Sequence, residues 1–246
     1  LSCIYILQII ISFIKIREDV KIGKSSDFME YKDSENLLPI SLIIPAYNEE
    51  DNIVQNVKSL MKLNYPEFEL IVVNDGSKDK THYKMIEAFK LYPIESAHMR
   101  QLETAKVRNV YYNVEYPNLI YVDKENGGHG DAVNAGLDHA EGKYFKVVDS
   151  DDWVDEEALY KILDVLKTFE EEEKQVDMLL ANYVYEKEGM EHKKVIEYKN
   201  VLPQEEIFGW NDVKHFHLGQ YILMHSVIYR TDFLKLCQLR LPKHTF

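Results

Sequence analysis

The segment Val147-Val148-Asp149-Ser150-Asp151-Asp152-Trp153 indicates a sheet that carries functional groups at its carboxyl edge. Two β-branched apolar residues end a predicted strand, and carboxylates then crowd into the next few positions, where like charges repel unless they share a cation. Proteins hold Mg²⁺ or Mn²⁺ with one or two carboxylates and leave the other positions to phosphate oxygens and water. The segment therefore predicts a metal site at a strand end.

Other interpretations of this acidic segment depend on its neighbours. A turn that only caps the helix starting near Asp155 stays open, because Asp is a good N-cap. An EF-hand loop fails, because its sixth position is Val154 instead of Gly and its twelfth is Tyr160 instead of Glu. A phosphatase of the Asp-x-Asp-x-Thr/Val type is disfavoured, because Trp153 stands where a small residue is needed.

The composition is typical of a globular protein. With 246 residues, of which 46% are apolar, the chain can form one large α/β domain. A formal charge of −13 argues against a nucleic-acid polymer as partner, because phosphate backbones are bound by clustered Lys and Arg. The cysteines Cys3 and Cys237 have no metal or redox spacing, which fits a reducing compartment.

The first residues are similar to the end of a membrane helix. Residues 1–14 are almost entirely apolar and are followed by Lys15, Arg17, Lys21 and Lys24. A bilayer span needs about 20 residues, so we expect residues 1–38 to be a truncated transmembrane or juxtamembrane segment with a linker; a buried core helix stays open. If residues 1–14 lie in a membrane, the basic flank places the rest in the cytoplasm, with residues 1–24 attaching it to the cytoplasmic face of the cell membrane.

Strand, loop and helix then alternate. Ile40–Ile44 and Phe68–Val73 are apolar runs typical of buried strands, and helical spacing follows each of them. We expect further strands at Leu119–Val122, Lys143–Val148 and Val176–Val184. This alternation predicts an α/β, Rossmann-like fold with a mostly parallel central sheet and helices on both faces, which binds ligands at the carboxyl ends of its strands. Those ends are Pro45–Glu49, Asn74–Ser77 and Asp149–Asp152.

A glycine-rich turn, Asn126-Gly127-Gly128-His129-Gly130, precedes another predicted helix. Such a turn lets a backbone come close to a ligand, and the helix N-terminus favours an anion. Its spacing matches neither the Walker nor the dinucleotide pattern. Near the C-terminus we expect packing or surface roles for His215, His217 and His225, because they show no metal-ligand spacing.

Four motifs follow one another in order: Ser41-Leu-Ile-Ile-Pro-Ala-Tyr-Asn-Glu-Glu50, Ile71-Val-Val-Asn-Asp-Gly-Ser77, Asn126-Gly-Gly with Asn134-Ala-Gly136, and Val148-Asp-Ser-Asp-Asp152. As a set, they resemble the family-2 inverting glycosyltransferases of the GT-A fold. The N-terminal half resembles the bacterial membrane-associated polysaccharide synthases, and the C-terminal half resembles soluble single-addition members. The resemblance covers about residues 39–163 and implies a GT-A domain over residues 39–246.

The resemblance also implies a site for a nucleotide diphosphate sugar, which we expect to be a UDP-sugar. The implied nucleotide-sugar contacts are Pro45, Ala46, Tyr47, Glu49, Asp75, Gly128, Asp149 and Ser150. The implied metal, Mg²⁺ or Mn²⁺, lies on Asp151 and Asp149. Because alternate carboxylates past a strand can reach one cation from the same side, we expect Asp151 to coordinate directly and Asp152 to turn toward the following helix.

The implied reaction transfers the sugar with inversion to a glycan or lipid-linked acceptor in cell-surface polysaccharide synthesis. No catalytic base is identifiable, and we expect it beyond Phe246. The alternative is a nucleotide-sugar binding fragment without turnover. Nucleotidyl transfer is disfavoured because Pro45–Asn48 contains neither the glycine nor the basic residue that such enzymes carry after the first strand.

Overall fold

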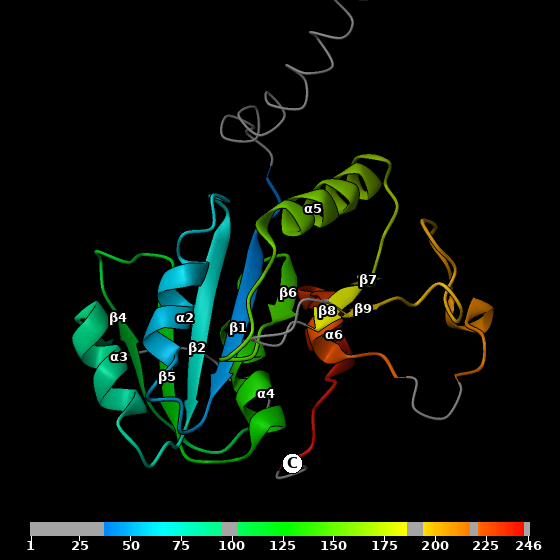
Figure 1. Ribbon diagram of the computed structural model, residues 1–246. Coiled ribbons are helices and arrows are strands. Elements are labelled where there is room, and N and C mark those ends of the chain that lie inside the picture. The colour runs from blue at the N-terminus through cyan, green and yellow to red at the C-terminus, as the bar shows by residue number, and fades with distance from the viewer. Residues whose placement is uncertain (1–36, 95–102, 186–193, 217–220, 244–246) are drawn as a thin grey trace, which may run out of the picture. The chain divides into compact units, whose positions relative to one another are not determined.

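The computed structural model describes residues 37–94, 103–185, 194–216 and 221–243 (Figure 1). The chain divides into two compact units, Leu1–Leu37 and Leu38–Phe246, and the fold below is that of the second. The expected membrane segment over residues 1–24 lies outside the described residues. Across the four described ranges, no helix is both long and apolar enough to cross a membrane.

An eight-stranded mixed sheet forms the centre of this unit. Its central strands are parallel: β1 (Ile40–Ala46), β2 (Phe68–Asp75), β5 (Leu119–Lys124) and β6 (Tyr144–Val147). Antiparallel strands flank them: β3 (Tyr92–Ile94), β4 (Val107–Tyr112), β7 (Met178–Leu180) and β10 (Val227–Arg230). The strand order is β3-β4-β5-β2-β1-β6-β10-β7. The predicted α/β fold with a mostly parallel centre is therefore confirmed.

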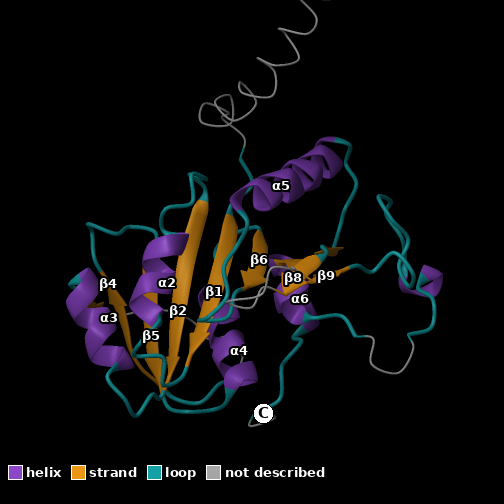
Figure 2. Cartoon of the chain, viewed as in Figure 1, coloured by secondary structure: helices purple, strands orange, loops and turns teal. Residues whose placement is uncertain are grey.

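Helices pack against this sheet (Figure 2). They are α2 (Ile53–Leu60), α3 (Thr81–Phe89), α4 (His129–His139), α5 (Glu156–Glu171) and α6 (Thr231–Cys237). Every residue of β1 is buried, as expected for a strand covered on both faces. On one face α4 lies very close to β1, because a Cβ atom on Gly136 would lie 2.3 Å from Cγ2 of Ile43. Glycine at this position thus sets the distance between the helix and the sheet.

The C-terminal third differs in part from the sequence-based expectation. The predicted strand Val176–Val184 is wrong in extent, because it forms two strands, β7 and β8 (Tyr183–Tyr185). Strand β7 joins the central sheet through β10, whereas β8 pairs with β9 (Lys194–Ile196) in a separate two-stranded sheet. Two 3₁₀ turns, η2 (Trp210–Asp212) and η3 (Met224–Ser226), complete the region, and η3 leads directly into β10.

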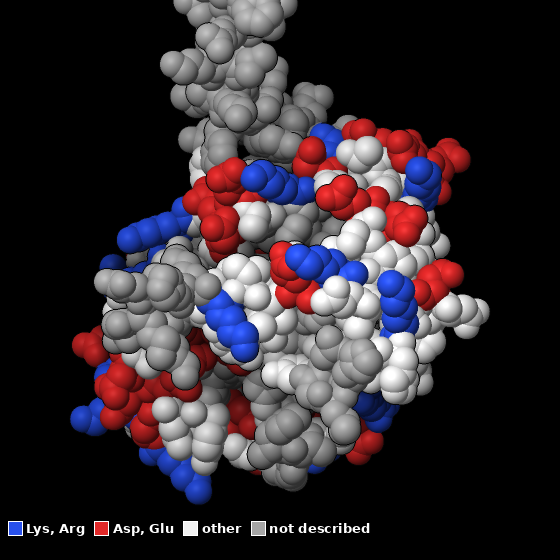
Figure 3. All heavy atoms as spheres, turned by 45° about the vertical axis from the view of Figure 1, so that its right-hand side comes forward, with Lys and Arg blue, Asp and Glu red and all other residues white. Residues whose placement is uncertain are grey.

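On the face shown in Figure 3, acidic side chains gather over α5 near the top, and basic side chains are interspersed among acidic ones. The sequence of α5 includes several acidic residues, among them Glu156, Glu157 and Glu170. The sequence begins this helix with an acidic first turn, which complements the positive end of the helix dipole.

Candidate functional site

One cavity at the carboxyl ends of β1, β2 and β6 brings the expected site residues together. Its volume is about 410 Å³. It is lined by all the expected nucleotide-sugar and metal residues, which are Pro45, Ala46, Tyr47, Glu49, Asp75, Gly128, Asp149, Ser150 and Asp151, and by Asn126, His129 and Ala132. A larger groove of about 620 Å³ lies between α2 and α3, but long surface side chains line it and it contains none of the expected residues.

The loop after β1 is held by the loop after β2. Asn48 has a φ of 57°, a left-handed conformation that Asn tolerates. Its backbone N–H donates to Oγ of Ser77 over 3.0 Å, and the N–H of Glu49 donates to Oγ1 of Thr81 over 2.8 Å. Tyr47 is 43% exposed at this cavity. The two loops therefore hold the backbone next to Tyr47, whose exposed ring offers a surface on which a planar ligand could stack.

Asp75 ends β2 and is almost fully buried. The backbone N–H of Gly127 donates to its Oδ1 over 2.9 Å, and the N–H of Gly128 donates to its Oδ2 over 2.8 Å. The anion expected at the start of α4 is thus supplied from within the chain by Asp75. The ammonium group of Lys124 also donates to Oδ1 of Asp75 and lies 2.7 Å from Oδ2 of Asp131. The sequence did not identify this buried lysine, because a charged residue at a strand end is usually solvated.

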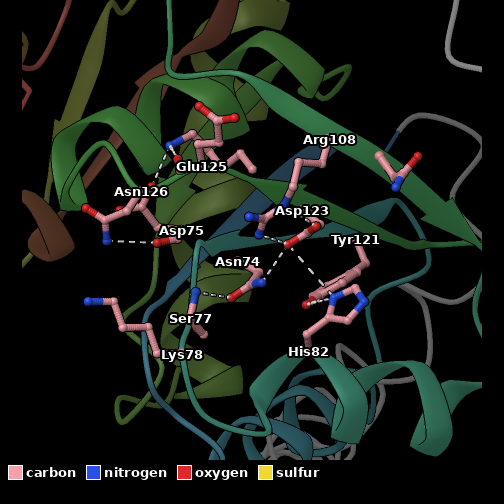
Figure 4. Close-up of polar contacts among 12 residues, drawn as sticks. Asn74, Asp75, Ser77, Lys78, His82, Arg108, Tyr121, Asp123, Glu125 and Asn126 are labelled. Carbon is pink, nitrogen blue, oxygen red and sulfur yellow. Dashed lines mark hydrogen bonds and ion pairs between the residues drawn. The ribbon is translucent and has the colours of Figure 1, made fainter.

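A second polar cluster joins the ends of β2 and β5 to α3 and β4, through residues that do not line the cavity (Figure 4). Arg108 donates twice to Asp123, from Nε to Oδ2 and from Nη2 to Oδ1, both over 2.7 Å. Asn74 donates to the same carboxylate over 2.7 Å, and His82 lies 3.2 Å from the hydroxyl oxygen of Tyr121. Burial and then the charge of Asp123 raise the pKa of Tyr121. The hydroxyl group of Tyr121 therefore stays protonated, and the hydrogen bonds of the cluster hold the strand ends together.

Asp149 lies between two histidines. Nε2 of His129 is 3.1 Å from its Oδ1, and Nε2 of His225 is 3.0 Å from its Oδ2. Burial alone would raise the pKa of Asp149, but the hydrogen bonds and charges of the two histidines outweigh burial and hold that pKa well below its ordinary value. The sequence therefore predicted no partner for His225, and the structure places it against a carboxylate of the expected site. His215 is exposed, and His217 lies outside the described residues.

Within the described ranges, Asp149, Asp152 and His225 form a group whose potential ligand atoms all lie within 4.8 Å of one another. Asp151 lines the cavity but is not part of this group. The capping bond of α5 goes to Oδ1 of Asp155, which accepts from the N–H of Ala158 over 2.8 Å, whereas Asp152 belongs to the group around Asp149. The acidic segment therefore does not serve as the cap of that helix.

Lys146 supports this group from β6. Its ammonium group donates to the backbone carbonyl of His225. Burial lowers the pKa of Lys146 to about 8, although the charge of Asp152 acts in the opposite direction. A lysine thus holds the turn that carries His225, a contact that sequence patterns do not reveal because Lys146 lies inside an apolar strand.

The comparisons with known proteins agree with this geometry. The family model described as glycosyl transferase family 2 matches residues 41–101 and 100–232. The chain is 27% identical over 191 residues to glycosyltransferase GlyA of Streptococcus pneumoniae serotype 4, covering 73% of this chain and 23% of GlyA. It is 29% identical over 141 residues to the minor teichoic acid biosynthesis protein GgaB of Bacillus subtilis, covering 56% of this chain and 13% of GgaB.

Among solved structures, the chain is similar to residues 1–349 of S. aureus TarS. The TM-score is 0.55 at 27% identity, and the match covers 83% of this chain and 50% of the TarS chain. The same TarS fragment in complex with UDP-GlcNAc matches with a TM-score of 0.54 at 27% identity, over 84% of this chain and 49% of that chain. The chain thus spans about half of the TarS fragment and less of GlyA and GgaB. This likeness confirms the expected GT-A type of fold.

Proposed function

This chain belongs to glycosyl transferase family 2, and from that premise we propose that it transfers a sugar from UDP to a hydroxyl group of a glycan or lipid-linked acceptor, with inversion. The observation that carries the proposal is the single cavity that collects the nucleotide-sugar residues from four separate motifs. The TarS complex with UDP-GlcNAc supports a UDP-sugar donor, and the name of GgaB supports a role in cell-surface polysaccharide synthesis.

In this proposal the nucleoside lies between the first two loops. The exposed ring of Tyr47 stacks on the base, and Asp75 accepts a hydrogen bond from the nucleoside. Both groups act without a metal. Ser77 and Thr81 hold the backbone that follows Tyr47, and the N–H groups of Gly127 and Gly128 hold Asp75, so both parts of the nucleoside site are formed before a ligand arrives.

The acidic cluster suits a divalent cation. Two carboxylates and an imidazole within 4.8 Å of one another offer oxygen and nitrogen donors that fit Mn²⁺, and Asp149 with Asp152 alone would fit Mg²⁺. Asp149, Asp152 and His225 would hold the ion, and Asp151 would reach it from the cavity wall. When bound, such an ion neutralises the negative charge that grows on a diphosphate leaving group.

The remaining parts of the chain complete the proposal. Residues 39–246 carry the transferase domain, and residues 1–24 attach it to the cytoplasmic face of the cell membrane. The acceptor hydroxyl needs a carboxylate base, and the proposal assigns that role to none of the described residues. Binding of a nucleotide sugar without turnover is the outcome that would favour the alternative function.

Calorimetric titration with UDP and UDP-sugars, with and without Mn²⁺, tests the donor. We expect UDP to bind without Mn²⁺ and more tightly with it, and ADP to serve as the mismatched control. Release of UDP from a UDP-sugar in the presence of polyol or oligosaccharide acceptors then tests transfer. Failure of every UDP-sugar to bind better than ADP would refute the proposal, whereas binding without release would reduce it to a binding module.

A further inference from the structure

The ammonium group of Lys124 is fully used by contacts within the protein and is not available to a ligand. The side chain is completely buried, with an exposed fraction of 0%. The ammonium group reaches three acceptors: the carboxylate of Asp75, Oδ2 of Asp131 at 2.7 Å and the carbonyl of Glu125 at 2.8 Å. An ammonium group has three N–H donors, so all three are used. Lys124 therefore acts through the groups that it holds.

The first of these groups, Asp75, has its acceptor positions almost filled. Oδ1 accepts from Lys124 and from the N–H of Gly127, and Oδ2 accepts from the N–H of Gly128. A carboxylate oxygen offers two lone pairs. Among the described residues, one position on Oδ2 is left, and Asp75 lines the cavity. A ligand in the cavity thus meets a single acceptor with a fixed direction.

The surrounding backbone keeps this arrangement in place. The side-chain amide of Asn126 donates to the carbonyl of Asp75 over 2.9 Å (Figure 4). Gly76, with a φ of 69°, lies so close to Asn126 that an added Cβ atom would be 2.7 Å from the backbone nitrogen of Asn126. Asp131 in turn accepts from the N–H of Ala105 over 2.9 Å. Lys124 thus connects the end of β2, the glycine-rich turn and the start of β4.

The cation also determines what Asp75 can recognise. An ionised carboxylate only accepts hydrogen bonds, so it pairs with the N3–H of uracil and repels the N3 lone pair of cytosine. Without the ammonium group, only the N–H groups of Gly127 and Gly128 hold the carboxylate, and its free acceptor position no longer keeps the direction that separates the two bases. We propose that Lys124 is the positioning residue that makes this site select uracil over cytosine, an inference that rests on the proposed function.

Calorimetric titration of Lys124→Met with UDP and with CDP, both without metal, tests this inference. We expect the unchanged protein to bind UDP about 10-fold or more tightly than CDP, and the variant to bind the two within about threefold of each other, since one hydrogen bond is exchanged. Lys143→Met is the matched control, because Lys143 pairs with Glu170 at the surface, away from the cavity. This control should keep the wild-type ratio.

A merely structural role would lower the melting temperature and the fraction of protein that binds, but it would leave the ratio of the two dissociation constants unchanged. If Lys124→Met does not fold, Lys124→Met/Asp131→Asn keeps the buried formal charge of the group the same and should lose the preference as well. A wild-type ratio in either folded variant would overturn the inference alone. Failure of the unchanged protein to bind UDP would overturn the proposed function and this inference with it.

Discussion

Asp152→Asn should stabilise the protein in the absence of metal and remove its response to Mn²⁺. The pKa of Asp152 is raised, first by burial and then by the charges of Asp149 and Asp151. A carboxyl group whose pKa is raised by folding costs the folded state stability at any pH above that pKa. At neutral pH the Asn side chain keeps the shape and removes this cost.

The distance between the carboxylates of Asp149 and Asp152 gives the size of the repulsion that Asp152→Asn removes. At the limit of 4.8 Å, two unit charges repel by about 0.9 kcal/mol in bulk water and by about 3.5 kcal/mol at an effective dielectric constant of 20. Asp152 keeps much of its surface in solvent even though part of its carboxyl group is buried, so the lower figure applies, and His225 and Lys146 offset part of it. We therefore expect the melting temperature of the metal-free protein to rise by about 2 °C.

In Asp152→Asn the stabilisation by Mn²⁺ should decrease, although the metal-free protein becomes more stable. Loss of a ligand weakens metal binding by about 10- to 100-fold or more, since even outer partners of ligands have effects of this size. At a Mn²⁺ concentration of about 100 times the wild-type dissociation constant, metal stabilises by about 2.7 kcal/mol, and a 100-fold loss reduces this to about 0.4 kcal/mol. Thermal melting with saturating UDP, with and without Mn²⁺, measures both effects.

Two further variants make the result decisive. Asp155→Asn is the control, because Asn caps a helix as well as Asp and this residue lies outside the ligand group. Asp151→Asn tests the ligand expected from the sequence. A wild-type Mn²⁺ response in Asp152→Asn, or a fall of several degrees in its metal-free melting temperature, would refute the reasoning, and loss of the response in Asp151→Asn alone would assign the metal to Asp151.

Other variants test the rest of the site. Asp75→Ala should weaken UDP binding by about 1 to 3 kcal/mol with or without Mn²⁺, as measured by calorimetry. Gly127→Ala should lower stability by about 1 to 3 kcal/mol in thermal melts, because its Cβ atom would lie 2.1 Å from a carboxylate oxygen of α4, whereas Gly209→Ala, with no atom nearer than 3.7 Å, should not. The pKa of Lys146 is lowered to about 8 in the folded protein, against 10.5 in the unfolded chain, so the unfolded chain binds more protons between these pH values. The free energy of unfolding should therefore increase from about pH 8 to pH 10.5, and denaturant titrations of Lys146→Met should lack this increase. A truncated chain beginning at Asn36 should keep the UDP affinity of the full chain in calorimetry, because the sheet begins at Ile40; loss of folding would place the missing residues in the core.

The central sheet was predictable because its strands are buried on both faces. Apolar runs without alternation mark such strands, and the runs beginning at Ile40 and Phe68 became β1 and β2 with extensions of two residues at their carboxyl ends. The cavity followed from topology, since parallel strands place their carboxyl ends at one edge. These inferences need only local patterns and a general rule of chain connection.

The partners of the buried charges were not predictable in the same way. Lys124 ends an apolar run, as many solvated lysines do, and only the approach of Asp75 and Asp131 from other elements makes it a buried ion pair. The pairing depends on a turn in which both Gly127 and Gly128 donate to one carboxylate. The spacing of the glycines predicts the turn, but it does not predict that Lys124, Asp75 and Asp131 point toward one another.

His225 shows how one strand pairing decides a site. Strand β10 is antiparallel to β6, with Tyr229 opposite Phe145. His225 precedes Tyr229 by as many residues as Asp149 follows Phe145, so the register carries the histidine to the aspartate even though η3 and the end of β6 interrupt the ladder. A shift by one residue would turn the side chains of β10 to the opposite face and remove His225 from the cluster. The ligand group therefore depends on a register that the apolar ends of β10 and β6 set through core packing, since Val227 and Ile228 are buried beside Phe145 and Val147.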